Sequence, residues 1–142
     1  MSPPKRRPAP CPPNGPDGWP LFPRGRKKVL VSGSRSFTDY KLLKDRLEYY
    51  TFELYDFAII TGGCPKGADA LAAKFAFQER YLYLPIEADW DKHGKKAGPI
   101  RNQEIVNFCS VAVFFWDGRS PGTADCLDRM KRTGKPYRVV RF

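Results

Sequence analysis

The stretch Val29-Leu-Val-Ser-Gly-Ser-Arg-Ser-Phe37 passes from an apolar run into a loop of small, hydroxyl-bearing and charged residues. An apolar run that ends at a glycine is typical of a strand buried on both faces of a parallel sheet. The next segment has apolar side chains at spacings of four, three and four residues: Leu43, Leu47, Tyr50 and Leu54. This spacing predicts an amphipathic helix, for which Asp39 is the candidate N-cap.

The alternation of apolar runs and helical stripes continues to the end of the chain. Further strands are predicted over residues 57–61, 81–86, 111–115 and 137–142. Further helices are predicted over residues 67–80, 99–108 and 123–132, and residues 87–97 are predicted to form a polar loop. Strands that alternate with helices in this way predict an α/β fold: a Rossmann-like three-layer sandwich with a five-stranded, mainly parallel sheet.

Composition limits the classes of protein to which the chain can belong. Its 142 residues suit a single domain, and a hydrophobic content of 42% excludes a wholly disordered chain. We expect a cytoplasmic protein with no membrane contact, since no apolar run approaches the roughly 18 residues of a membrane span and no apolar stretch follows the basic start. Four separated cysteines and a single histidine argue against a structural zinc site.

Residues 1–26 differ in composition from the rest of the chain. They hold nine of the 14 prolines, five basic residues and one acid. Because proline fixes φ and lacks an N–H group, this segment is predicted to be an extended, basic N-terminal arm. We expect it to pack Trp19, Leu21 and Phe22 onto a domain formed by residues 27–142. The alternative is a proline-rich interaction tail.

Net charge and loop composition point to a phosphate-bearing ligand. The formal net charge is +10, which favours nucleotides or nucleic acids as partners. In such sheets, ligands bind beyond the carboxyl ends of the strands. The four strand-to-helix loops at that edge are rich in glycine, hydroxyl groups and cations: residues 33–37, 62–69, 90–102 and 116–123. Glycine lets backbone N–H groups approach an anion and a helix N-terminus attracts it, although ordinary tight turns would also explain the glycines.

These loops supply the candidate ligand-binding residues. They are Gly33, Ser34, Arg35, Gly62, Gly63, Lys66, Gly67, Asp69, Trp90, Arg101, Asn102, Trp116, Ser120, Gly122 and Thr123. Backbone N–H groups and the two arginines suit phosphates, and Asp69 and Asn102 suit a ribose or a base edge. The two tryptophans suit stacking on a base, or are packing anchors. Residues 62–69 lack the terminal Gly-Lys-Ser/Thr of an ATPase P-loop, so hydrolysis of that type is not expected.

Acidic residues in and near the loops are candidates for acid–base catalysis or for holding a metal. For an enzyme that hydrolyses an N-glycosidic or phosphoanhydride bond, Asp69, Asp125 and Asp89 are the candidate acids or bases, and Arg101 is a further catalytic candidate. Helix capping is the alternative role for Asp69. Asp89 and Asp91 could gather Mg²⁺ together with a phosphate-bearing ligand, and no other metal or cofactor is predicted.

Four motifs occur in order along the chain: Val31–Phe37, Thr61–Asp69, Trp90–His93 with Gly98–Asn102, and Trp116–Thr123. As a set they resemble the SLOG superfamily, in particular its YspA/YAcAr branch, the YspA cpYpsA-related SLOG group. The resemblance covers residues 28–142. It implies a Rossmann-like domain that binds nucleotides, ADP-ribose derivatives or related small ligands. A sensor or sequestering protein for such a ligand is the leading prediction.

Two groups that the chain also resembles give alternative functions. Lonely Guy phosphoribohydrolases cleave the N-glycosidic bond of nucleoside monophosphates with an arginine and the glutamate of a Gly-Gly-x-Gly-Thr-x-x-Glu motif. The segment here is Ser120-Pro-Gly-Thr-Ala-Asp-Cys126, so Cys126 replaces the glutamate and this activity is disfavoured. The DNA-processing protein A family has similar Gly-Ser-Arg and Gly-Gly-x-x-x-Gly-x-Asp motifs and binds single-stranded DNA. This resemblance and the net charge of +10 make single-stranded nucleic acid an alternative partner.

Aromatic residues near the first two predicted helices exceed what the inward-facing stripes use. They are Tyr49, Tyr50, Phe52, Tyr55, Phe77 and Tyr81. Exposed apolar patches mark interfaces and two-fold dimers are the commonest assemblies, so these residues predict a homodimer. The alternative is that the proline-rich arm covers this surface within one chain.

Overall fold

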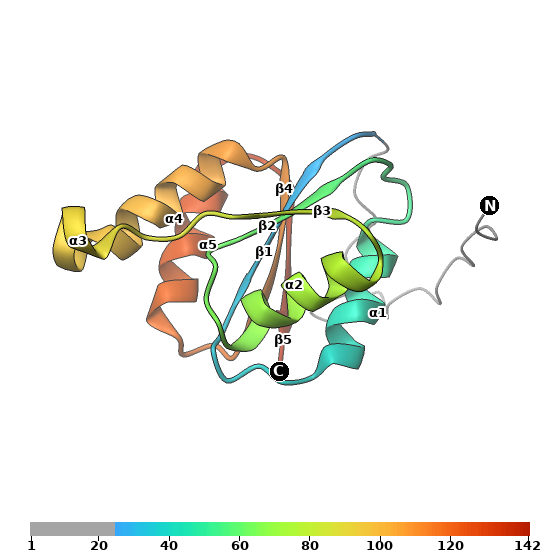
Figure 1. The fold of residues 1–142 in the computed structure, drawn as a ribbon, viewed down its shortest axis with the longest axis horizontal. Helices are drawn as coiled ribbons and strands as arrows, with labels where there is room; N and C mark the ends of the chain where they lie inside the picture. Colours follow the sequence, from blue (N-terminus) through green and yellow to red (C-terminus); the bar gives the residue numbers. More distant parts are fainter. Residues whose placement is uncertain (1–24) are drawn as a thin grey trace.

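A computed structural model describes residues 25–142, which form a sheet between two layers of helices (Figure 1). The strands are β1 (Lys28–Gly33), β2 (Ala58–Thr61), β3 (Leu82–Pro85), β4 (Val111–Trp116) and β5 (Tyr137–Arg141). Their spatial order is β3-β2-β1-β4-β5, and each neighbouring pair is parallel. The predicted α/β, Rossmann-like fold with a five-stranded sheet is confirmed.

Helices cover both faces of this sheet. They are α1 (Tyr40–Tyr50), α2 (Gly67–Gln78), α3 (Trp90–His93), η1 (Gly94–Lys96), α4 (Ala97–Phe108) and α5 (Pro121–Thr133). Figure 1 shows α1 and α2 on one side of the strands and α4 and α5 on the other. Within residues 25–142, no helix combines the length and the apolar character that crossing a membrane requires. Residues 1–24 of the predicted arm, with Trp19, Leu21 and Phe22, lie outside the described residues.

The two faces of the sheet bury alternate residues of the same strands. Val29 and Val31 of β1 belong to the core on the α1 and α2 side, whereas Leu30 between them belongs to the core with α4 and α5. In β4, Phe115 lies in the first core and Phe114 in the second. All five side chains are fully buried. A strand covered on both faces needs apolar residues at successive positions, which explains the continuous apolar runs.

Local capping explains where two of the helices begin. The Asp39 carboxylate accepts a hydrogen bond from the Leu42 N–H at 3.0 Å, so the predicted N-cap of α1 is confirmed. The prediction of a polar loop over residues 87–97 is wrong in part, because α3 and η1 form there. Asp89 caps α3 by accepting from the Lys92 N–H at 3.1 Å, and this bond starts a helical turn that apolar periodicity does not reveal.

The aromatic residues expected at a dimer interface are divided between core and surface. Tyr49 and Tyr50 are 8% and 0% exposed and belong to the core on the α1 and α2 side, so their assignment to an exposed patch is wrong. Phe77 is 89% exposed and Tyr55 is 50% exposed. The homodimer itself stays a prediction.

The strand order reverses between β1 and β4, at the centre of the sheet. Gly33, the last residue of β1, pairs with Phe115 of β4. A Cβ atom on Gly33 would collide with the Phe115 carbonyl oxygen and with the side chain of Ala68 in α2. The Ser34 N–H donates to the Phe115 carbonyl at 3.0 Å, and the Ala68 N–H donates to the Ser34 carbonyl at 3.3 Å. β1, β4 and α2 therefore meet backbone to backbone at the point where such sheets bind ligands.

We expect Gly33→Ala to lower the free energy of unfolding by about 1–3 kcal/mol, the range for overpacking a close contact. Neither the Phe115 carbonyl nor Ala68 can give way without moving β4 or α2. Urea denaturation followed by circular dichroism measures the change.

The matched control is Gly122→Ala. A Cβ atom on Gly122 has no neighbour within 4 Å, and Gly122 lies in α5. Alanine is expected there to leave the stability unchanged or to raise it by up to about 1 kcal/mol. Equal effects of the two substitutions would contradict the close contact at Gly33.

Candidate functional site

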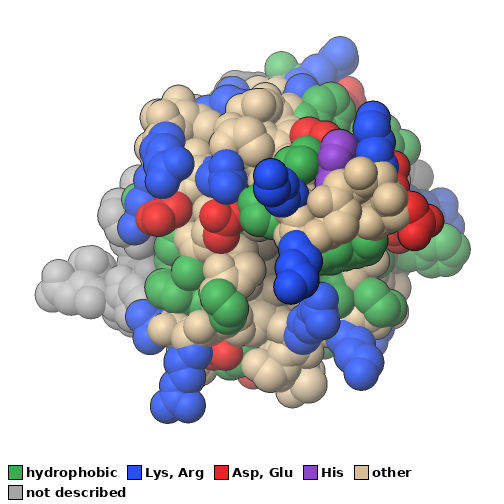
Figure 2. All heavy atoms as spheres, turned by 90° about the vertical axis from the view of Figure 1, so that its left-hand side faces the viewer, with side chains coloured by type: hydrophobic (Ala, Val, Ile, Leu, Met, Phe, Trp, Pro, Cys, Tyr) green, Lys and Arg blue, Asp and Glu red, His purple; other side chains and the backbone are tan. Residues whose placement is uncertain are grey.

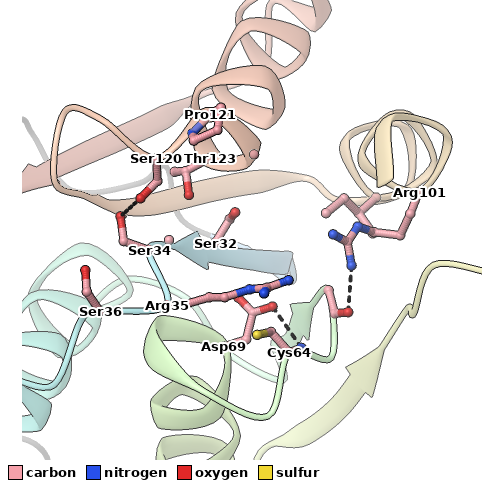
Figure 3. A pocket seen from close by; sticks show the side chains of 14 residues that line it. Ser32, Ser34, Arg35, Ser36, Cys64, Asp69, Arg101, Ser120, Pro121 and Thr123 are labelled. Atoms are coloured by element: carbon pink, nitrogen blue, oxygen red, sulfur yellow. Dashed lines mark hydrogen bonds between the residues drawn. The ribbon is translucent and has the colours of Figure 1, made fainter. Parts of the chain in front are cut away.

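A cavity of about 530 Å³ opens at the carboxyl edge of the sheet, beside the reversal of strand order (Figure 3). The loops after β1 and β2, the helix α4 and the first turn of α5 line it. Nine of the predicted residues lie in its wall: Gly33, Ser34, Arg35, Gly62, Asp69, Arg101, Ser120, Gly122 and Thr123. Its volume falls within the range of about 300–1,000 Å³ that is typical of small-molecule sites.

The helix α5 begins at this cavity with donors that no side chain caps. Ser120 is the N-cap residue, and its side chain makes no capping hydrogen bond. Pro121 has no N–H group, and Gly122 and Thr123 follow it in the first turn, in the cavity wall. Because the first N–H groups of a helix lack partners within the helix, the start of α5 offers donors and a positive dipole end to an anion.

Asp117 fixes the loop that joins β4 to α5. Its carboxylate accepts hydrogen bonds from the Ser120 and Arg119 N–H groups, both at 2.8 Å, and from the Ser120 hydroxyl at 3.0 Å. These bonds, the Ser120 N–H first, lower the pKa of Asp117 to about 2. The Ser120 and Ser34 hydroxyls lie 2.9 Å apart, so the loops after β4 and β1 are joined across the cavity wall (Figure 3).

Arg101 of α4 reaches across to the loop after β2. Its Nη1 donates to the Gly62 carbonyl at 2.7 Å, and its Nε donates to the Asn102 side-chain oxygen at 3.0 Å. The Asn102 amide in turn donates to Asp125 of α5 at 2.9 Å. These bonds hold the guanidinium in place. They use two of its five N–H groups, so further donors remain for a ligand.

Asp69 is a buried carboxyl group in the cavity wall. It is 8% exposed and accepts the Cys64 N–H at 3.2 Å. Burial raises the pKa of Asp69 to about 6, although the Cys64 N–H and the charges of Arg101 and Arg35 act to lower it. Among the residues that the structure describes, it is the one carboxylate that lines the cavity. A pKa near 6 lets this group hold or release a proton close to neutral pH.

Arg35 supplies a second guanidinium at the cavity. Its side chain is exposed and extends over Asp69 in Figure 3. In the described part of the chain, the Arg35 guanidinium forms no hydrogen bond or ion pair with another residue. Its donors therefore remain available to a ligand, whereas those of Arg101 are partly used within the protein.

Six predicted residues lie outside the cavity wall: Gly63, Lys66, Gly67, Trp90, Asn102 and Trp116. Gly67 (φ +72°) lets α2 begin directly against the backbone of Ser34 and Arg35, and Asn102 holds Arg101. These two residues therefore support the cavity from behind. Lys66 is exposed at the N-cap position of α2.

Both tryptophans point elsewhere for identifiable reasons. The Trp116 indole N–H donates to the Ser120 carbonyl at 3.1 Å, and the Arg141 guanidinium lies 5.2 Å from the ring centroid. Trp90 stands on α3, which extends from the end of the molecule in Figure 1, and is 57% exposed. In this structure neither ring forms part of the cavity wall.

The sequence reasoning missed five lining residues: Ser32, Ser36, Cys64, Ile105 and Pro121. Ser36, Cys64 and Pro121 lie within the strand-to-helix loops predicted from the sequence, so their position in these loops could have predicted that they line the cavity. Ser32 is inside a strand and Ile105 inside a helix, and only the packing of α4 against the sheet brings these two to the cavity.

The remaining catalytic candidates have structural partners. Asp125 accepts from Arg129 Nε at 2.9 Å as well as from Asn102. Cys126, at the position of the Lonely Guy glutamate, is 1% exposed, and burial raises its pKa to about 12, so its thiol is a core group. Asp89 caps α3. Residues 25–142 contain no group of three or more His, Cys, Asp or Glu side chains placed to hold a metal ion.

Comparison with known proteins places these features in a family. The family model described as "YspA, cpYpsA-related SLOG family" matches residues 27–93. The Gene 61 protein of Mycobacterium phage D29 is 36% identical over 123 residues, which cover 82% of this chain and 96% of the phage protein. Among solved structures, the C-terminal domain of a hydrogenase from Pyrococcus furiosus aligns over 85% of this chain and 95% of that one, with a TM-score of 0.46 and 12% identity. By the family match and a relative of this identity and coverage, the chain belongs to the YspA, cpYpsA-related SLOG family.

Proposed function

We propose that this protein binds a nucleotide or a nucleotide-derived ligand of the ADP-ribose type in the cavity, and acts as a sensor or sequestering protein for it. The observation that carries the proposal is the pairing of a guanidinium that bonds to no other described residue with a helix start that its N-cap side chain leaves uncapped. Arg35 and the first turn of α5 both face one cavity of about 530 Å³. Phosphate oxygens are the groups that such donors bind best.

The other polar groups of the cavity wall are consistent with this ligand class. Arg101 adds a second positive charge that Gly62 and Asn102 hold in place. Asp69, protonated or ionised, can accept a hydrogen bond from a sugar hydroxyl. The phosphate of a phosphorylated sugar would thus contact cations and N–H groups of the protein. The hydroxyls of the sugar would contact the Asp69 carboxyl group.

Hydrolysis of the bound ligand would depend on Asp69 within the described residues, because Asp125, Asp89 and Cys126 have the structural roles given above. Prolonged incubation with nucleoside monophosphates and ADP-ribose, followed by chromatography, tests for this activity. The appearance of free base or ribose 5-phosphate with the native chain but not with Asp69→Asn would make the protein an enzyme.

Single-stranded nucleic acid is the second candidate, because three exposed lysines gather beside α3. Lys92 of α3 and Lys95 and Lys96 of η1 are exposed. Figure 2 faces the side of the molecule on which α3 lies in Figure 1, and Lys and Arg side chains are widely spread over it. For this candidate the logarithm of the affinity should fall steeply with the logarithm of the salt concentration. We expect instead that an oligonucleotide shows no mobility shift at about 0.15 M salt, whereas ADP-ribose still binds in calorimetry.

We expect Arg35→Ala to weaken binding of ADP-ribose by about 1.5–3 kcal/mol, the range for a hydrogen bond to a charged group. Isothermal titration calorimetry measures the affinity. The matched control is Arg26→Ala, which removes the same charge near Asp56, before the amino end of β1 and so at the opposite edge of the sheet.

Binding of ADP-ribose to the control should match binding to the native chain. If the two variants lose affinity equally, net charge and not the cavity attracts the ligand. If Arg35→Ala binds as well as the native chain, Arg35 does not belong to the site.

Asp69 makes the affinity depend on pH in a defined direction. Its pKa of about 6 means that it is neutral below that pH, where the two guanidinium groups act unopposed, and negative above it. We therefore expect the affinity for ADP-ribose, whose pyrophosphate charge does not change in this range, to fall by about tenfold from about pH 5 to about pH 8. In Asp69→Asn the affinity should stay flat with pH. Identical profiles for the two proteins would contradict this role.

A further inference from the structure

The side chains that face the cavity are polar with few exceptions. Its wall has five hydroxyl groups: those of Ser32, Ser34, Ser36, Ser120 and Thr123. It also has two guanidinium groups and one carboxyl group. The apolar contribution comes from Ile105, Pro121 and the thiol of Cys64, so no aromatic ring from residues 25–142 lines the cavity.

A nucleotide base stacks best on an aromatic side chain, and neither Trp116 nor Trp90 lines the cavity. The Trp116 ring lies between the Ser120 carbonyl, to which it donates, and the Arg141 guanidinium. To enter the cavity it would lose both contacts. Trp90 packs near Gly98, at the start of α4, and leaves more than half of its surface to solvent.

We propose that the cavity recognises the sugar-phosphate part of its ligand and does not select the base. This inference rests on the proposed function and narrows it to ligands that carry a 5-phosphorylated pentose. Hydroxyl, guanidinium and N–H groups match the phosphate and the sugar hydroxyls, while the cavity wall that residues 25–142 form offers the base no aromatic ring. Stacking on an aromatic side chain strengthens binding by about 5- to 150-fold per base, a contribution that no lining residue within 25–142 can make.

Calorimetry with six probes tests the inference on the full chain. The probes are AMP, GMP, CMP, UMP, ribose 5-phosphate and adenosine, with inorganic phosphate as a seventh measurement. The four nucleotides and ribose 5-phosphate should bind within about tenfold of one another, since no stacking contribution separates them. Adenosine and inorganic phosphate should each bind more than about tenfold more weakly, because each lacks one of the two recognised parts.

Two substitutions sharpen this test. Arg35→Ala should lower the affinities for AMP and for ribose 5-phosphate by the same factor, because Arg35 contacts the phosphate that both ligands carry. Trp90→Ala should leave both affinities unchanged. If Trp90→Ala lowered the affinity for AMP and not that for ribose 5-phosphate, the base would stack on Trp90 and the inference would be overturned.

The outcomes separate this inference from the proposed function. A preference of more than about tenfold among the four bases, or for AMP over ribose 5-phosphate, overturns the inference and leaves nucleotide binding intact. Adenosine binding as tightly as AMP, or inorganic phosphate binding as tightly as ribose 5-phosphate, also overturns it. If ribose 5-phosphate binds and no nucleotide does, the inference also fails, because it expects the four nucleotides to bind within about tenfold of ribose 5-phosphate. If none of the probes binds, the inference fails, and the proposed function fails with it only if ADP-ribose does not bind either.

Discussion

The contact of three backbone segments at the end of β1 is the constraint on which the rest of the structure depends. Gly33 has no side chain, so the Phe115 carbonyl of β4 and Ala68 of α2 approach it directly. The Ser34 carbonyl accepts the Ala68 N–H, and the Ser34 N–H is donated to Phe115. This contact fixes the starts of the loops after β1 and β4 relative to each other. Because these loops diverge there to opposite faces of the sheet, the cavity between them follows from the topology.

The site combines groups that are fixed by the protein with groups left open to solvent. Asp69 and Arg101 are partly or largely buried and are hydrogen-bonded to Cys64, Gly62 and Asn102, so they hold their positions without a ligand. Arg35 has no such bond within the described residues and is exposed. A rigid wall with one adjustable cation allows close contact with an anion at a small cost in conformational entropy.

The sequence predicted the strands and most loop residues of the site because both are local properties. Apolar runs such as the one that begins at Val29 follow from burial on two faces, and glycine and serine mark the ends of strands whatever their neighbours are. The direction of a side chain is not local. Trp116 ends β4 but lies outside the cavity wall, with its ring near Arg141 of β5, whereas Ile105 of α4 lines the cavity. The short helix α3 escaped prediction because one capping bond from Asp89, and no periodic pattern, forms it.

The open space around Gly122 has a consequence for the shape of the binding site. A side chain at this position would meet no protein atom within 4 Å, and the residue lies in the cavity wall. The scaffold therefore leaves room for a mutation that narrows the binding site while the strand ends and α2 keep their packing. Gly33 and Gly122 of the cavity wall thus differ: a side chain at Gly33 would disturb the packing of the fold, whereas a side chain at Gly122 would change the space open to a ligand.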